Sequence, residues 1–253
     1  MKYSIIGTGN MAWFLATRLK EAKWSCRGVW GRSFEKAADL ASAAGGKAYN
    51  TLSELPDDVD ACLLAVSDDQ IALLAHELTL KGAFLIHFGG AVPLEVLPGE
   101  QKAVVWFIYS ILKDNLPQHR ALPAVVEAQG EKARQVAMAL AHAVSDIVQE
   151  VASEQRRLLH LGAVFANNFT NHLMTVCEEL CRKNQLSFDL LKPILQQTFS
   201  RVRNHSPFEL QTGPARRGDE QTIQSHLNLL HSEPELQELY RLLSKMISSK
   251  HGL

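Results

Sequence analysis

The stretch Ile5-Ile6-Gly7-Thr8-Gly9-Asn10-Met11-Ala12 decides the fold of this 253-residue chain. An apolar run leads into it and a helical pattern follows it, as the G-x-G-x-x-A version of a strand–turn–helix fingerprint requires. Gly7 permits the tight turn, Gly9 lets the backbone approach a pyrophosphate, and Ala12 allows the helix to pack closely on the strand. The helix N-terminus offers unpaired N–H groups to phosphates. The stretch therefore predicts a dinucleotide-binding turn; the alternative is a domain of this shape without a ligand.

Apolar runs typical of strands alternate with helical patterns up to about residue 151. The predicted strands are Tyr3–Ile6, Cys26–Trp30, Ala61–Val66, Ala83–Phe88, Val104–Ile108, Pro123–Glu127 and Ile147–Val151, and the clearest helical patterns are Phe34–Ala44, Asp69–Leu78 and Glu131–Ala143. Such alternation indicates right-handed βαβ units and a mostly parallel sheet covered on both faces. Residues 1–151 are therefore predicted to form a doubly wound α/β domain, a Rossmann domain.

Only helical patterns follow residue 151. The predicted helices are Ser153–Cys181, Ser187–Val202 with Ser187 as N-cap, a helix led by Asp219 to about His231, and Pro234–Ser249. Serine and aspartate are favoured N-cap residues, because their side-chain oxygens accept hydrogen bonds from the first turn. Residues 152–253 are predicted to be an all-helical domain that contributes to substrate binding and dimerisation.

Composition excludes several classes of protein. Hydrophobic residues make up 46% and charged residues 21% of the chain, as in globular proteins. The 26 Lys and Arg against 27 Asp and Glu give a formal net charge of -1, so we expect no nucleic-acid partner. No apolar run is long enough to span a bilayer, and Gly7–Asn10 interrupts the first one too early for a signal peptide.

The four cysteines form no Cys-x-x-Cys pair, and no nearby histidine completes a metal site with Cys177 and Cys181. We expect free thiols, no bound metal and a cytoplasmic protein.

The end of the second predicted strand selects the cofactor. An NAD-binding domain usually places Asp or Glu there for the ribose 2′-hydroxyl, but this chain has Gly31-Arg32-Ser33, with Lys36 one helical turn further on. A guanidinium and a hydroxyl suit a 2′-phosphate. The pattern favours NADP(H); alternatively, Ser33 is a helix N-cap and Arg32 a solvated loop residue, and Ser33 can fill both roles.

Two further strands end in polar or small residues, where ligands collect in open α/β sheets. Val66-Ser67-Asp68 closes one, and Ile86-His87-Phe88-Gly89-Gly90 closes the other. His87 is expected to line the nicotinamide pocket or to bond to the backbone, more than to act in catalysis. The predicted cofactor-binding set is Gly7, Thr8, Gly9, Asn10, Met11, Ala12, Gly31, Arg32, Ser33, Val66, Ser67, Asp68, His87 and Gly89.

These motifs resemble a known group of proteins. Gly7–Ala12, Gly31–Ser33 and Val66–Asp68 are similar to the N-terminal domains of pyrroline-5-carboxylate reductase and the β-hydroxyacid dehydrogenase superfamily, including deazaflavin-dependent NADP oxidoreductases. Ser153–Leu173, Thr212–Asp219 and His226-Leu227 resemble a bacterial group that joins a Rossmann domain to a helical domain of unknown function. The resemblance spans nearly the whole chain and implies an NADP-dependent oxidoreductase.

Two segments depart from that group's pattern. Relatives carry His-Thr-Ser/Ala-Gly where this chain has His87-Phe88-Gly89-Gly90, and Tyr-Pro-Leu/Met-Gln-Thr-Phe where it reads Tyr109-Ser110-Ile111-Leu112-Lys113-Asp114. Both segments follow predicted strands beside the presumed active site. Even if the group has a common substrate, that substrate therefore need not be the substrate of this chain.

The first helix of the second half lacks a familiar catalytic group. In β-hydroxyacid dehydrogenases this helix carries Lys-x-x-Asn, and the resemblance aligns Asn167 and Asn168 with its asparagines and Val164 with its lysine. Valine cannot transfer a proton. Polar residues nevertheless recur along this apolar helix, with His160, Asn167 and Asn171 seven and four positions apart and Asn168 and His172 as a second pair. They line a cleft or form a helix–helix hydrogen-bond network, because unpaired buried polar groups cost about 1–3 kcal/mol each.

Several functions remain open. Candidate catalytic residues are His160, Asn167 and Asn168; candidate substrate-binding residues are Asn171, Arg216 and Arg217, although the arginines could instead pair across a dimer interface. The leading hypothesis is an NADP-dependent reductase of a small carbonyl or imine compound, acting as a homodimer through its helical domain. The alternative is a non-catalytic, dimeric NADP-binding sensor.

Overall fold

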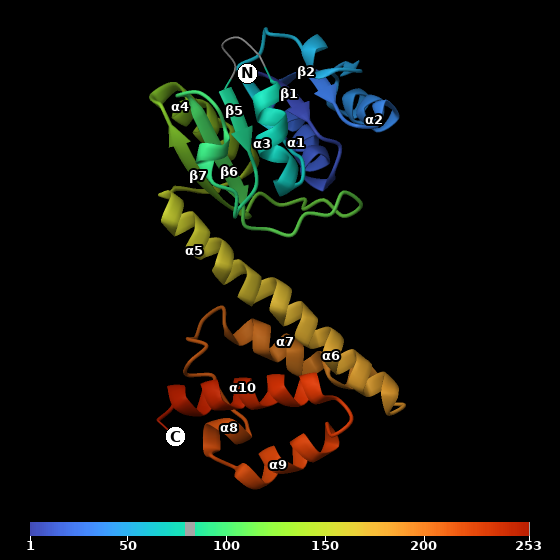
Figure 1. Ribbon diagram of the computed structural model, residues 1–253, viewed down its shortest axis with the longest axis vertical. Coiled ribbons are helices and arrows are strands. Elements are labelled where there is room, and N and C mark those ends of the chain that lie inside the picture. The colour runs from blue at the N-terminus through green and yellow to red at the C-terminus, as the bar shows by residue number, and fades with distance from the viewer. Residues whose placement is uncertain (79–83, 253) are drawn as a thin grey trace. The chain divides into compact units, whose positions relative to one another are not determined.

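A computed structural model describes residues 1–78 and 84–252, and it divides into two compact units, residues 1–172 and 173–253. The first unit is an α/β domain built on one sheet (Figure 1). Its described strands are β1 (Lys2–Ile6), β2 (Ser25–Trp30), β3 (Ala48–Tyr49), β4 (Ala61–Leu64), β5 (Phe84–His87), β6 (Lys102–Phe107), β7 (Pro123–Gln129) and β8 (Ile147–Glu150). Ala83, the first residue of one predicted strand, lies outside the described residues.

The strand order is β3-β2-β1-β4-β5-β6-β7-β8, which contains the order of a doubly wound Rossmann sheet. Neighbouring strands are parallel except β6 and β7, which run antiparallel with Val105 opposite Val126. The prediction of a mostly parallel, doubly wound sheet followed by helices is confirmed. The two-residue strand β3 was not predicted, since it is too short to show a pattern.

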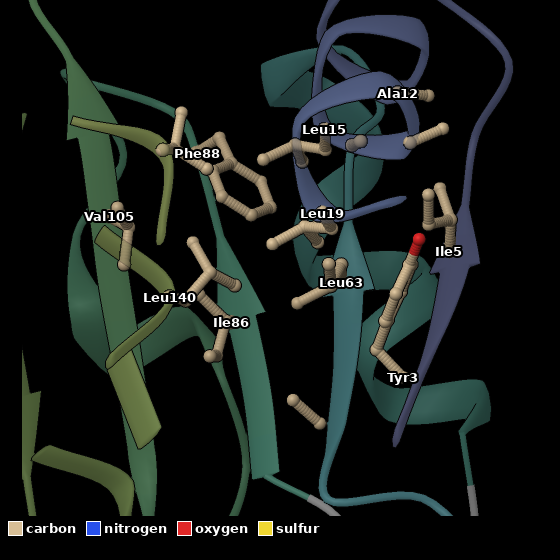
Figure 2. Packing of buried hydrophobic residues seen from close by; sticks show 14 of the residues in the cluster. Tyr3, Ile5, Ala12, Leu15, Leu19, Leu63, Ile86, Phe88, Val105 and Leu140 are labelled. Atoms are coloured by element: carbon tan, nitrogen blue, oxygen red, sulfur yellow. The ribbon is translucent and has the colours of Figure 1, made fainter. Parts of the chain in front are cut away.

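Helices cover both faces of the sheet, and alternate strand residues point to each face. Helices α1 (Asn10–Glu21), α2 (Phe34–Ala44) and α4 (Glu131–Val144) pack on one face, where Tyr3, Ile5 and Leu63 are fully buried (Figure 2). Helix α3 (Asp68–Glu77) packs on the other face, together with the short 3-10 turn η2 (Leu94–Val96). Another such turn, η1 (Leu52–Glu54), precedes β4.

A long helical segment continues from the sheet. It consists of α5 (Ser153–Ala163), a π-helical segment η3 (Val164–Phe169) and α6 (Thr170–Lys183). The last strand, β8, ends at Glu150, one residue before the predicted end at Val151. The compact units divide at 172/173, because α5 is attached to the sheet domain by buried contacts described below. The π-helical segment was not predicted.

The second unit is helical throughout its described part. It contains the end of α6, the 3-10 turn η4 (Phe188–Leu190), α7 (Lys192–Arg201), α8 (Pro214–Arg217), α9 (Glu220–Leu229) and α10 (Pro234–Lys250). Ser187 and Asp219 cap η4 and α9 as predicted, accepting hydrogen bonds from the N–H groups of Asp189 and Thr222. The single helix predicted over 187–202 is instead η4 followed by α7. In residues 1–78 and 84–252, none of the helices has the length and apolar character needed to span a membrane.

Candidate cofactor site

The turn between β1 and α1 can be built only with glycine at its first position. Gly7 has φ +118°, a conformation that other residues rarely adopt, and a Cβ there would lie 2.2 Å from the carbonyl oxygen of Ala65 on the neighbouring strand connection. Its N–H donates to the Trp30 carbonyl at 2.8 Å. Gly7 therefore holds the ends of β1, β2 and β4 close together.

Gly9 is needed for a different reason. Its φ of -83° is available to any residue, and a Cβ there would meet nothing within 4 Å. Gly9 is the N-cap of α1, no side chain caps the helix, and the first turn carries no acidic residue. The α1 N-terminus thus presents free N–H groups beside open space, the arrangement that binds phosphates.

That open space is a cavity of about 930 Å³, in the size range of ligand pockets. It is lined by Gly7, Thr8, Gly9, Asn10, Met11, Trp13, Trp30, Gly31, Arg32, Ser33, Lys36, Asp39, Ala65, Val66, Ser67, Gln70, Leu74 and Lys113. Ten of the predicted cofactor residues are in this lining. Trp13, Trp30 and Gln70 flank the predicted motifs but were not included in them, and Lys113 was not predicted because it is distant from them in the sequence.

Four predicted cofactor residues do not line the cavity. Ala12 is buried in the core, where it allows α1 to pack on the sheet. Asp68 begins α3 and lies against Gly89, since a Cβ on Gly89 would be 2.8 Å from the Asp68 Oδ1 atom. His87 is fully buried.

The end of β2 presents two cations to the cavity. Arg32 and Lys36 are exposed at its rim, and Ser33 caps α2 by accepting a hydrogen bond from the Lys36 N–H at 3.4 Å. A hydrogen bond with the Ser67 hydroxyl lowers the pKa of Asp69, and Arg32 contributes to the same shift through its charge. Ser33 therefore fills the predicted capping role and also lines the cavity beside Arg32.

His87 is a structural residue at the end of β5. Its Nδ1 atom accepts a hydrogen bond from the Gly89 N–H at 3.2 Å, as expected if it bonds to the backbone. Burial, together with the nearby Arg156 guanidinium, lowers the pKa of His87 to about 4. The ring is therefore neutral at physiological pH and cannot supply a proton as an imidazolium.

A buried ion pair, missed from the sequence, joins α5 to the sheet. Arg156 is fully buried, and its Nε atom donates to the Glu127 carboxylate on β7 at 2.7 Å. Its Nη1 atom donates to the carbonyls of Gly90 at 2.6 Å and Gly89 at 3.2 Å, and Ser153 also bonds to Glu127. A glutamate inside the apolar run of β7 is the signal that could have revealed it, because buried charges are almost always paired.

His160 lies beside the strand ends. Its ring is 5.2 Å from that of Trp106 on β6, centroid to centroid, and a Cβ on Gly90 would be 2.5 Å from its Cδ2 atom. Among the three predicted catalytic residues, His160 is the one with these contacts to the loop that follows β5. The geometry places an imidazole at the carboxyl edge of the sheet.

Asn167 and Asn168 lie in the π-helical segment and are exposed. The spacings of seven and four positions between His160, Asn167 and Asn171 were counted along a regular α-helix. A π turn closes hydrogen bonds five residues apart and takes in more residues than an α turn. The rotation between His160 and Asn167 therefore differs from that of a regular α-helix. Asn171 is also exposed, and Val164 begins the π-helical segment.

The second unit holds the remaining predicted residues. Arg216 and Arg217 are exposed on α8, and Arg217 forms an ion pair with Asp219 at 3.9 Å. His226 on α9 bonds through Nδ1 to the Tyr240 hydroxyl at 2.8 Å. All four cysteines are free thiols. Within the described ranges, no cluster of His, Cys, Asp and Glu could hold a metal ion.

Two family models match the chain. Residues 2–89 match the model described as NADP oxidoreductase, coenzyme F420-dependent, and residues 122–247 match a domain of unknown function, DUF2520. No curated protein matches.

Solved structures resemble the chain over nearly its full length. A "putative NADP oxidoreductase" from Bacteroides fragilis is 32% identical with a TM-score of 0.87, and 98% of each chain is covered. A pyrroline-5-carboxylate reductase from Coxiella burnetii is 18% identical with a TM-score of 0.56, covering 99% of this chain and 97% of the other. An imine reductase from Myxococcus stipitatus in complex with NADP+ is 14% identical with a TM-score of 0.67, covering 98% and 92%.

The pyrroline-5-carboxylate reductase and the imine reductase are similar to this chain in fold alone. The Bacteroides fragilis protein is similar in both fold and sequence. The fingerprint turn, the cations at the end of β2 and the full-length similarity agree with one another. The chain therefore belongs to the family of NADP oxidoreductases in which this NADP-binding domain is followed by a helical DUF2520 domain.

Proposed function

We propose that this protein binds NADP(H) in the cavity above α1 and reduces a small carbonyl or imine metabolite. The observation that carries the proposal is the open N-terminus of α1 at Gly9 with Arg32, Ser33 and Lys36 around the same 930 Å³ space. A pyrophosphate suits free N–H groups at a helix N-terminus. A 2′-phosphate suits a guanidinium fork, a hydroxyl and an ammonium group. The residues present therefore fit NADP(H).

The cofactor supplies a hydride and its electron pair when it is bound, so the protein has to orient the electrophilic carbon and deliver one proton to the oxygen or nitrogen. Val164 cannot deliver that proton, and His87 is held neutral by burial. We assign proton delivery to His160, which lies against Gly90 and Trp106, or to water. Asn167 and Asn168 remain candidate catalytic residues, and Asn171, Arg216 and Arg217 remain candidate substrate ligands.

An imine is the favoured substrate. A C=N nitrogen is more basic than a carbonyl oxygen, so its reduction demands less of a protein acid. The absence of a lysine at position 164 is therefore easier to accommodate with an imine than with a hydroxyacid. The names of the pyrroline-5-carboxylate and imine reductases that share the fold support the same choice.

A second candidate is a dimeric NADP-binding sensor without turnover, which Val164 favours. One assay distinguishes the two functions. It follows the loss of NADPH absorbance over time with a panel of small cyclic imines, 2-oxoacids and aldehydes. We expect steady turnover with at least one imine, and a His160→Asn variant that keeps its NADPH affinity within a few-fold while kcat falls about 100-fold. NADPH binding without turnover across the panel would contradict the reductase and support the sensor. We place the protein in the cytoplasm in either case.

A further inference from the structure

Residues 109–119, here called the strap, cross from β6 toward β7 and contact the N-terminus of α1. The backbone N–H of Lys113 donates to the Asn10 side-chain oxygen at 3.2 Å, and Asn10 is the first residue of α1. Leu112 and Asn115 form an isolated antiparallel bridge, so Lys113 lies in a tight turn. The strap thus places this lysine at the mouth of the cofactor cavity, whose lining includes it.

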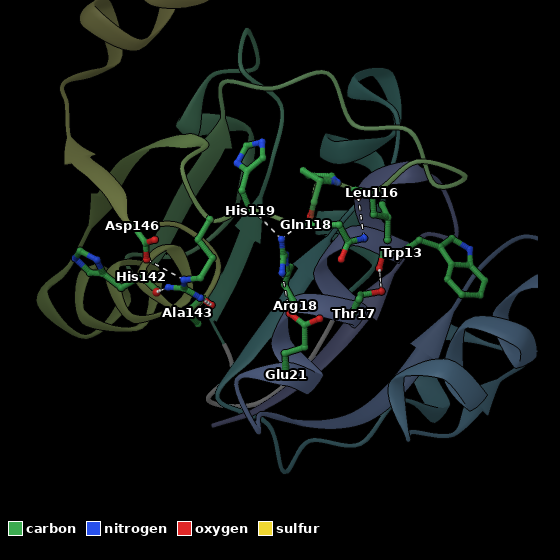
Figure 3. Close-up of polar contacts among 12 residues, drawn as sticks. Trp13, Thr17, Arg18, Glu21, Leu116, Gln118, His119, His142, Ala143 and Asp146 are labelled. Atoms are coloured by element: carbon green, nitrogen blue, oxygen red, sulfur yellow. Dashed lines mark hydrogen bonds and ion pairs between the residues drawn. The ribbon is translucent and has the colours of Figure 1, made fainter.

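The far end of the strap is held by a buried arginine. Arg18 of α1 is 8% exposed, and its Nη2 atom donates to the carbonyls of Pro117 and His119 while Nη1 pairs with Glu21 at 2.9 Å (Figure 3). The apolar side chains of Ile111 and Leu116 pack against the sheet core. Because both ends are fixed to α1 or to the core, the strap holds the backbone of Lys113 in place beside the α1 N-terminus.

The charges around the cavity are unevenly distributed. Arg32 and Lys36 both follow β2, where the 2′-phosphate is expected, and Asp39, the one carboxylate in the lining, lies on the same helix as Lys36. The α1 N-terminus offers the pyrophosphate neutral N–H donors and a partial positive charge. Lys113 is the cation in the lining that is tied to this helix end.

We propose that the Lys113 ammonium group binds the pyrophosphate of NADP(H). This inference rests on the proposed function. An ammonium group on a flexible stem acts as a point charge, which suits a phosphate whose orientation is already fixed by backbone N–H groups.

The test compares two substitutions against two cofactors by fluorescence titration. Lys113→Met should weaken NADPH and NADH binding by the same factor, about five- to tenfold for an exposed, partly screened phosphate contact. Arg32→Ala should weaken NADPH alone. Lys113→Arg should restore most of the affinity, and Lys132→Met, at an exposed lysine of α4, should leave both affinities unchanged.

Salt dependence gives a second readout. The fall of NADPH affinity with rising salt should be shallower for Lys113→Met than for wild type, because one ionic contact has been removed. Unchanged affinity for both cofactors in Lys113→Met, or a loss confined to NADPH, would overturn the inference while leaving the proposed function intact. Failure of the wild-type protein to bind NADPH would overturn the proposed function itself.

Discussion

Gly7 and Gly9 stand two positions apart in one motif, yet the structure requires them for different reasons. Gly7 is required by the fold, since its backbone conformation and the Ala65 carbonyl exclude a side chain. Gly9 has an ordinary conformation and faces open space, so the fold itself would accept a larger residue. The sequence fingerprint predicts both glycines but cannot separate these roles, because the neighbouring strand that crowds Gly7 is distant in sequence.

Gly9→Val should therefore abolish NADPH binding without loss of stability. The valine side chain would occupy the space in which a phosphate approaches the helix N-terminus. Gly7→Ala, the matched variant, should cost about 3 kcal/mol of the free energy of unfolding, because it combines backbone strain with a steric clash. Calorimetric titration and urea unfolding of both variants check this. Normal NADPH binding by Gly9→Val, or its failure to fold, would refute the assignment.

His87 should make the protein acid-sensitive. Its pKa of about 4 in the folded state is below the value near 6.5 expected in the unfolded chain, so between these pH values the unfolded state binds the extra proton. The contribution of His87 to stability is complete above pH 6.5 and should fall by about 3 kcal/mol as the pH drops to 4.

His87→Asn retains an acceptor for the Gly89 N–H but has no titrating group. Urea unfolding at pH 7 and pH 4.5 should show a smaller loss of stability for this variant than for wild type. Equal losses of unfolding free energy in the two proteins would show that groups other than His87 cause the acid sensitivity.

Sequence patterns predict the bounds of most helices and strands, but they do not predict how α5 is attached to the sheet. The bounds of α2 match the prediction, and most predicted strands lie within a few residues of the observed ones, because local hydrophobic periodicity determines them. The antiparallel direction of β7 was not predicted, since a strand's pattern does not encode its direction. The attachment of α5 was also missed, because it depends on an ion pair between residues 29 positions apart.

The contributions of Glu127 and Arg156 to the free energy of unfolding should be strongly coupled. Glu127→Gln or Arg156→Met alone should cost about 3–5 kcal/mol of the free energy of unfolding, because each leaves a buried charge or its hydrogen-bond partners unpaired. The double variant Glu127→Leu/Arg156→Met should lose less than the sum of the two single variants. A double-mutant cycle from urea unfolding measures this coupling. Additive losses would show that α5 is held by its apolar contacts instead.

The helical unit exposes many large apolar side chains to solvent, which is unfavourable in water. The described parts of α6, α7 and α10 contain no buried residue. Its exposed large apolar side chains include Leu173, Leu186, Leu190, Ile194, Phe199, Val202, Phe208, Leu229, Leu242, Leu243 and Met246. Patches of this kind usually mark interfaces, and a second copy of the chain is the partner predicted from the sequence. Amphipathic spacing indicates such faces but does not identify what covers them.

The protein should therefore be a dimer at micromolar concentration. Leu190→Asp, at a side chain that is 73% exposed on η4, should shift it toward monomer, whereas Leu73→Asp, at a 59% exposed leucine of α3, should not. Multi-angle light scattering of the three proteins measures this. A wild-type monomer under these conditions would contradict the predicted homodimer.

We expect Arg32 and its neighbours at the end of β2 to bind the 2′-phosphate of NADP(H). Isothermal titration of NADPH and NADH into wild type and Arg32→Ala tests it most directly. Wild type should bind NADPH at least about tenfold more tightly than NADH, since one charge-assisted contact of about 1.4 kcal/mol corresponds to a factor of ten. Arg32→Ala should lose most of this preference while keeping its NADH affinity. Equal affinities of the wild-type protein for NADPH and NADH would contradict a role of Arg32 in binding the 2′-phosphate.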